Sequence, residues 1–134
     1  PGDSETKFVS NMVKSIKEKA PFIDLTPGEQ KRDFIYVADV VAAIELALKR
    51  SSDLRKPYTR TDLGTGSSYT LRYFLETLKA VSGNTDTELR FGKLPYRENE
   101  IMEAKADPDL LTSWGWKPSY SLNQGLLLTV DQTI

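Results

Sequence analysis

Cysteine and histidine are both absent from the 134 residues of the chain. Without cysteine the chain has no disulfide, no thiol nucleophile and no cysteine metal site. Without histidine it lacks the commonest general base and the commonest metal ligand, so acid–base chemistry would depend on Asp, Glu, Lys or Tyr. We therefore expect neither a metal site nor histidine-based catalysis in this chain.

Long apolar runs and an excess of basic charge are missing as well. No segment approaches the ~20 apolar residues that span a bilayer, and the net charge is −1 with a pI near 5.5. This excludes nucleic acid as a bulk electrostatic partner and predicts no membrane segment. With 39% hydrophobic and 28% charged residues, the composition is typical of one globular domain over residues 1–134, in a reducing cytoplasm.

The hydrophobic pattern predicts alternating helices and strands. Apolar residues at helical spacing predict amphipathic helices, and short aromatic or β-branched runs predict strands. The expected helices are 8–16, 40–49, 71–82, 107–111 and 122–130, and the expected strands are 22–25, 34–37, 58–63 and 88–92. We expect Asp39, Thr70 and Ser121 to cap the helices that follow them. This order predicts the α/β class.

Gly64-Thr65-Gly66 lies between a predicted strand and a predicted helix. That context is typical of a dinucleotide-binding loop, and an acidic residue stands about 20 positions further on, as that fingerprint requires. However, Tyr69 occupies the place of the third glycine, and its ring would block the close packing of helix on strand. The pattern therefore favours an ordinary glycine turn over a cofactor loop.

Arg32 and Arg97 are the two candidate anion contacts, one before a predicted strand and one in a loop that contains proline. A guanidinium can donate two parallel hydrogen bonds to phosphate oxygens. The alternative is a local salt bridge of each arginine with Asp33 or Glu100, worth under about 1 kcal/mol. Local pattern alone favours the salt bridges.

Five segments together resemble a known family. Residues 30–41, QKRDFIYVADVV, are similar to the "RDF-I-x-V-x-D-V" segment of extended short-chain dehydrogenases/reductases, the NAD-dependent nucleotide-sugar epimerases and dehydratases. Residues 62–66, DLGTG, are similar to the family's "N-x-G-x-G" turn, and residues 97–100, RENE, are similar to its "R-x-G-D" loop. Residues 114–118, WGWKP, are similar to its "L-G-W-x-P" segment, and Pro1-Gly2-Asp3 to the end of its "Y-G-P-G" loop.

The resemblance covers the C-terminal, substrate-binding portion of such an enzyme, a Rossmann-type α/β fold without the main NAD-binding lobe. The glycine-rich NAD loop and the catalytic Tyr-x-x-x-Lys pair do not occur in this sequence, so we expect an inactive fragment with no catalytic residue. NAD or NADP would be bound mainly by the N-terminal lobe of the intact enzyme, and we expect no cofactor on this fragment. The intact enzyme is expected to be a homodimer, and the fragment to self-associate through apolar surface left exposed.

The resemblance also implies site residues. Arg32 and Arg97 correspond to the pair that grips the pyrophosphate of a nucleotide-diphosphate sugar, which reverses the preference drawn from local pattern. Leu25 corresponds to a position that packs on the base, and Ser67 to one that reaches phosphate or ribose. Glu100 corresponds to an acid that orients Arg97 or a ribose hydroxyl. Lys7 and Phe8 open a helix that covers the ligand.

The expected function is binding of a CDP-, dTDP-, UDP- or GDP-linked sugar within an NAD(P)-dependent epimerase, dehydratase or 4-reductase. The run from Leu25 to Gln30 leans toward the family's CDP-sugar 4-reductases that make abequose or paratose. The alternatives are a non-catalytic nucleotide-sensing module of the same fold and a free-standing nucleotide-binding domain. The base, the sugar and the reaction are left open by the sequence.

Overall fold

The structure is a computed structural model that describes residues 4, 6–53 and 58–132. The helices are α1 (Phe8–Lys17), α2 (Val37–Arg50), α3 (Leu71–Val81), α4 (Asp109–Ser113) and α5 (Leu122–Gln132), with a 3₁₀ turn, η1 (Ser51–Asp53), after α2. The strands are β1 (Phe22–Leu25), β2 (Lys31–Arg32), β3 (Tyr69–Thr70), β4 (Glu88–Phe91) and β5 (Glu103–Ala104). No helix in these ranges is long and apolar enough to cross a bilayer. The α/β class predicted from sequence is confirmed.

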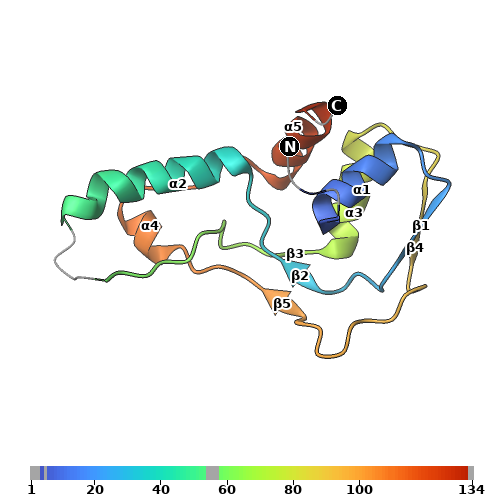
Figure 1. The fold of residues 1–134 in the computed structure, drawn as a ribbon, viewed down its shortest axis with the longest axis horizontal. Helices are drawn as coiled ribbons and strands as arrows, with labels where there is room; N and C mark the ends of the chain where they lie inside the picture. The colour runs from blue at the N-terminus through green and yellow to red at the C-terminus, as the bar shows by residue number, and fades with distance from the viewer. Residues whose placement is uncertain (1–3, 5, 54–57, 133–134) are drawn as a thin grey trace.

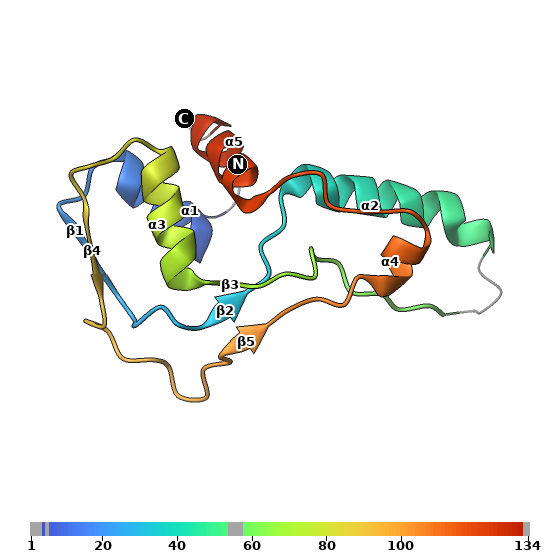
Figure 2. The same cartoon turned by 180° about the vertical axis from the view of Figure 1, so that it is seen from behind.

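The molecule is elongated, with two groups of elements joined by a narrow ribbon of strands (Figure 1). At one end, α1 and α3 cover one side of the parallel pair β1–β4. At the other end lie α2 and α4, and the view from behind shows the same separation (Figure 2). Between them β2 pairs antiparallel with β3 and parallel with β5.

The main hydrophobic core lies in the first group. Its buried members come from α1, β1, α3 and α5, and they are Met12, Val13, Ile16, Leu25, Phe74, Leu75, Leu78 and Leu126. The helices bury one apolar stripe each, as the 3.6-residue spacing predicts. At the start of α3, the Thr70 side chain accepts a hydrogen bond from the Tyr73 N–H at 3.1 Å, which confirms the predicted N-cap.

A smaller core joins α2 to α4 and the segment that follows α4. It contains Ala43, Leu111 and Trp116. The indole N–H of Trp116 donates to the carbonyl of Asp39 at 3.3 Å, so the polar end of this buried ring is satisfied.

Asp39 is not the N-cap of α2. The helix begins at Val37, with Tyr36 in the cap position, and Asp39 lies in the first turn. Its buried carboxylate accepts the backbone N–H groups of Ser119 at 2.8 Å and Tyr120 at 3.2 Å. The expectation was wrong because this side chain holds a distant loop in place instead of the orphan N–H groups of its own helix.

Two predicted strands differ from the structure. Residues 34–36 are irregular, and the strand of this region is β2, which ends at Arg32. Residues 58–63 form no strand, since no neighbouring strand pairs with them among the described residues. A strand-like sequence cannot form a strand without a partner for its backbone groups.

Candidate functional site

The Arg32 side chain connects β2 to the loop that precedes β5. One terminal nitrogen, Nη1, donates to the carbonyls of Lys31 at 2.8 Å and Ile101 at 2.7 Å. The other, Nη2, donates to Glu100 Oε1 at 2.6 Å, and both side chains of this ion pair are largely shielded from solvent. Three of the five guanidinium N–H donors are therefore committed within the chain.

Asp33, the next residue, holds two further segments in place. Its Oδ1 accepts the N–H of Thr65 at 3.0 Å and the hydroxyl of Thr65 at 2.6 Å. Its Oδ2 accepts the N–H of Gly66 at 2.9 Å and, at a longer 3.4 Å, that of Ala106. Arg32 and Asp33 thus hold three chain segments together. These segments are residues 31–33, 64–66 and 100–106.

These contacts attach the Gly64-Thr65-Gly66 turn to Asp33. The backbone N–H groups of Thr65 and Gly66 donate to the carboxylate of Asp33. Gly64 is required for close packing, because a Cβ there would lie 2.7 Å from Asp33 Oδ2. In this structure the turn serves the packing of the chain itself.

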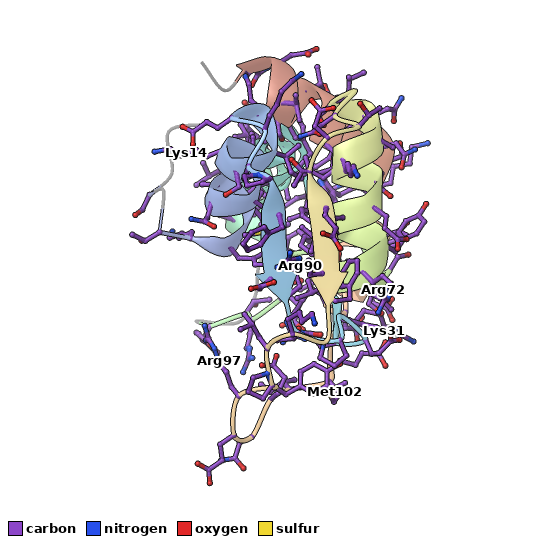
Figure 3. The ribbon with its side chains drawn as sticks, turned by 90° about the vertical axis from the view of Figure 1, so that its right-hand side faces the viewer. Lys14, Lys31, Arg72, Arg90, Arg97 and Met102 are labelled. Atoms are coloured by element: carbon purple, nitrogen blue, oxygen red, sulfur yellow. The ribbon has the colours of Figure 1, made fainter. Side chains whose placement is uncertain are left out.

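Arg97 is the contrasting arginine. It lies in the loop between β4 and β5, and its exposed guanidinium makes no hydrogen bond or ion pair with the part of the chain that the structure describes. Figure 3 shows Arg97 at the lower left of the molecule, below Arg90, with Arg72 and Lys31 to the right. All five donors of Arg97 are available to a ligand.

Glu100 is brought to Arg32 and not to Arg97. The backbone N–H of Glu100 donates to the carbonyl of Arg97 at 3.1 Å, which forms a turn between these residues, but the carboxylate points to Arg32. Asn99 in the same turn has a φ of 61°. Although the turn joins them, the Glu100 carboxylate binds Arg32 and forms no ion pair with the Arg97 guanidinium.

The other expected site residues lie in different surroundings. Lys7 and Phe8 are exposed at the start of α1, and the Phe8 ring lies 6.1 Å from that of Phe74. Ser67 is exposed next to the glycine turn. Leu25 is only 7% exposed and belongs to the main core, so it offers little surface to a base in this structure.

Asp33 is the residue whose role sequence reasoning missed. It was considered only as a salt-bridge partner of a nearby arginine, whereas its partners are backbone and hydroxyl groups 32 to 73 positions away. The sequence offered one signal for this role. Asp33 directly follows Arg32, and the glycine turn at residues 64–66 has backbone N–H groups that need an acceptor.

Two hollows among the described residues lie away from the expected site. An apolar hollow of about 90 Å³ lies between residues 34–36 and α5, and a wide, open depression of about 690 Å³ runs along α3 and β4. None of the seven expected site residues lines either one. The smaller hollow is below the roughly 300–1,000 Å³ of ligand pockets. Among the described residues no group of three or more acidic side chains could hold a metal ion.

Comparison with known proteins shows which family this chain resembles in sequence and in fold. The NAD dependent epimerase/dehydratase family model matches residues 1–59. The CDP-abequose synthase of Salmonella typhimurium is 35% identical over 127 residues, which are 94% of this chain and 42% of that protein. The structure of a UDP-glucose 4-epimerase from Thermotoga maritima with UDP-glucose matches with a TM-score of 0.77 and 29% identity, covering 96% of this chain and 39% of that one.

A UDP-glucose-4-epimerase from Stenotrophomonas maltophila, with bound NAD and formylated UDP-arabinopyranose, matches in fold with a TM-score of 0.81 at 23% identity. It is covered to 40%, and this chain to 98%. The chain therefore spans about two fifths of the length of the proteins it matches. From these matches, the chain belongs to the extended short-chain dehydrogenases/reductases of the NAD-dependent epimerase/dehydratase family, of which it represents one part.

Proposed function

We propose that this chain is the nucleotide-sugar-binding part of an NAD(P)-dependent sugar-nucleotide epimerase, dehydratase or 4-reductase. The observation that carries the proposal is the exposed and unpaired guanidinium of Arg97, held on a loop that Arg32 and Glu100 attach to β2. A diphosphate carries the charge and the paired oxygens that such a group binds.

Arg32 contributes in two ways under this proposal. It fixes the loop that carries Arg97, and its two remaining N–H donors are left for a phosphate oxygen. A diphosphate bound between the two arginines would be neutralised and oriented for chemistry elsewhere in the enzyme. Glu100 would compete with the phosphate for Arg32 unless it turns to a ribose hydroxyl.

The reaction itself requires the rest of the enzyme. NAD or NADP supplies the hydride chemistry in this family, and we expect the cofactor to be held mainly by an N-terminal lobe of the intact enzyme, outside this chain. The isolated chain contains no Tyr-x-x-x-Lys sequence. Its own residues bind and orient, and we expect the isolated chain to have no turnover.

The choice of nucleotide follows the relatives. The Salmonella protein at 35% identity is named for a CDP-linked sugar, whereas the Thermotoga structure holds UDP-glucose. We therefore place CDP first among the nucleotides to be tested, followed by UDP, dTDP and GDP.

Isothermal titration of the isolated chain with these four diphosphates tests the proposal. We expect weak binding of one of them, reduced at least tenfold by Arg97→Ala and by Arg32→Ala. Lys93→Ala is the matched control, because it removes an exposed positive charge from the same loop and should change the affinity less than twofold.

The controls separate a specific site from general charge attraction. Equal loss in the Lys93→Ala variant would indicate that the diphosphate responds only to net charge. Unchanged binding in Arg97→Ala, or no binding of any diphosphate to the wild-type chain, would contradict the proposed function.

A further inference from the structure

The loop from β4 to β5 is attached to other segments on both sides of Arg97. On the C-terminal side, Arg32 binds the Glu100 carboxylate. On the N-terminal side, the backbone N–H of Glu29 donates to the hydroxyl oxygen of Tyr96 at 3.2 Å. Tyr96 is half-buried and directly precedes Arg97. Of the hydrogen bonds that join this loop to other described segments, the one made by Tyr96 is therefore the nearest to Arg97 in sequence.

The segment that supplies this N–H, residues 27–30, is itself held by α3. It lies on the connection from β1 to β2, which runs above the loop in Figure 1. Backbone N–H groups in the first turn of α3 donate to the carbonyls of Gly28 and Gln30, both at 3.0 Å. The guanidinium of Arg72 donates to a further carbonyl of this segment at 2.9 Å. Because α3 lies in the main core, Tyr96 is attached to a well-supported part of the chain.

An arginine on an unattached loop binds an anion at a large entropic cost. Both its backbone and its long side chain must be ordered when the anion binds. The Tyr96 hydrogen bond restricts the backbone one residue before Arg97, and Pro95, one residue earlier, has a fixed φ. Part of the ordering that Arg97 needs is therefore complete before a ligand arrives.

We infer that Tyr96 is a positioning residue for Arg97. Its hydroxyl holds the loop on residues 27–30, so that the Arg97 guanidinium meets a diphosphate in a set orientation. Tyr96 acts on the ligand only through Arg97. This inference rests on the proposed function, because it takes Arg97 as the group that binds the diphosphate.

Nuclear spin relaxation of the ligand-free chain, labelled with ¹⁵N, tests the positioning role first. Tyr96→Phe keeps the ring and removes only the acceptor oxygen. Tyr58→Phe is the matched control, because Tyr58 is 76% exposed and its hydroxyl makes no hydrogen bond with a described residue. The measured quantity is the order parameter of the Arg97 backbone amide, which is about 0.85 for a rigid backbone and below about 0.6 for a flexible one.

We expect the order parameter of Arg97 to fall from the rigid range to the flexible range in Tyr96→Phe, and to stay unchanged in Tyr58→Phe. An unchanged value in Tyr96→Phe would overturn the inference. This measurement needs no ligand, so it decides the inference even if no diphosphate binds to the wild-type chain, a result that would refute the proposed function.

A double-mutant cycle then shows whether Tyr96 acts through Arg97. With CDP as the probe, Tyr96→Phe should weaken binding about three- to tenfold, the range expected for the loss of one hydrogen bond. The double variant Tyr96→Phe/Arg97→Ala should bind no more weakly than Arg97→Ala alone. Additive losses would overturn the inference, because Tyr96 would then act independently of Arg97. Loss of binding in Arg97→Ala with wild-type binding in Tyr96→Phe would refute the inference and leave the proposed function intact.

Discussion

Helices α2 and α3 have the same kind of sequence and opposite surroundings. α3 is 11 residues long and buries Phe74, Leu75, Thr77 and Leu78 against α1, α5 and the β1–β4 pair. α2 is longer, but it covers only a small core and leaves its main apolar stripe in solvent. Amphipathic spacing predicts a face that will be buried, and it does not say whether the chain in hand supplies the cover.

The two arginines repeat this contrast at the level of single side chains. The guanidinium of Arg32 donates to three groups of its own chain, whereas the guanidinium of Arg97 makes no hydrogen bond or ion pair with a described residue. The region around α3 holds the main core, whereas the α2 face and the guanidinium of Arg97 are exposed among the described residues.

The largest expected difference between the two regions comes from the same substitution on each helix. Leu75→Ala removes a side chain that is 1% exposed and should lower the free energy of unfolding by about 2–5 kcal/mol. Leu48→Ala, at 68% exposure, should change it by less than about 0.5 kcal/mol. Urea unfolding measures both values, and a similar loss for both would mean that α2 is already covered.

Removing the Asp33 carboxylate should have the next largest effect, since it accepts hydrogen bonds from Thr65, Gly66 and Ala106. Asp33→Ala leaves the N–H groups of Thr65 and Gly66 without their acceptor, at a cost of about 2–4 kcal/mol in unfolding free energy. Asp33→Asn keeps one acceptor oxygen and should lose about half as much. If the two variants unfold at the same urea concentration, these hydrogen bonds do not stabilise the fold.

Substitutions of Arg32 and Arg97 should differ in their effect on the free energy of unfolding. Arg32→Ala leaves the partly buried Glu100 carboxylate and the Ile101 carbonyl without a donor, and we expect a loss of about 1–3 kcal/mol. Arg97→Ala should change stability by less than about 0.5 kcal/mol while it weakens binding of the diphosphate. A stability loss of similar size in both variants would remove the distinction drawn between them.

The smallest effect concerns acid stability. The hydroxyl of Ser68 donates to Glu103 at 2.7 Å, and this hydrogen bond, assisted by the charge of Lys31, lowers the pKa of Glu103 below its ordinary 4.5. A carboxylate whose pKa is lowered by folding stabilises the fold at pH values above its ordinary pKa. This contribution is lost as the pH falls through the lowered pKa of the folded state. Glu103→Gln should therefore lower the Tm slightly at pH 7 and leave it unchanged near pH 2. Equal Tm changes at both pH values would exclude this titration.

The sequence pattern correctly predicted those helices, strands and caps that are determined by residues close together in the chain. The apolar stripes of α1 and α3, the Thr70 cap and the strand 22–25 were found because each depends on neighbours within a few residues. It failed for residues 58–63, which have strand-forming side chains but no partner strand in the described chain. It also placed a strand at 34–37, where the pairing that decides the position lies in the polar residues Lys31 and Arg32.

The site depends on contacts that no local pattern contains. Arg32 meets Glu100 across 68 positions, and Asp33 meets Ala106 across 73. The family resemblance singled out Arg32, Arg97 and Glu100 as site residues, but it implied that Glu100 orients Arg97 or a ribose hydroxyl. Only the folded chain shows that the carboxylate is held by Arg32.

Hydrogen exchange of the isolated chain tests most directly the contrast between α2 and α3. We predict that the amides of α3, which lies in the main core, are strongly protected, and that the amides of α2 exchange much faster because one face of this helix is exposed. Equal protection of the amides of the two helices would contradict this contrast.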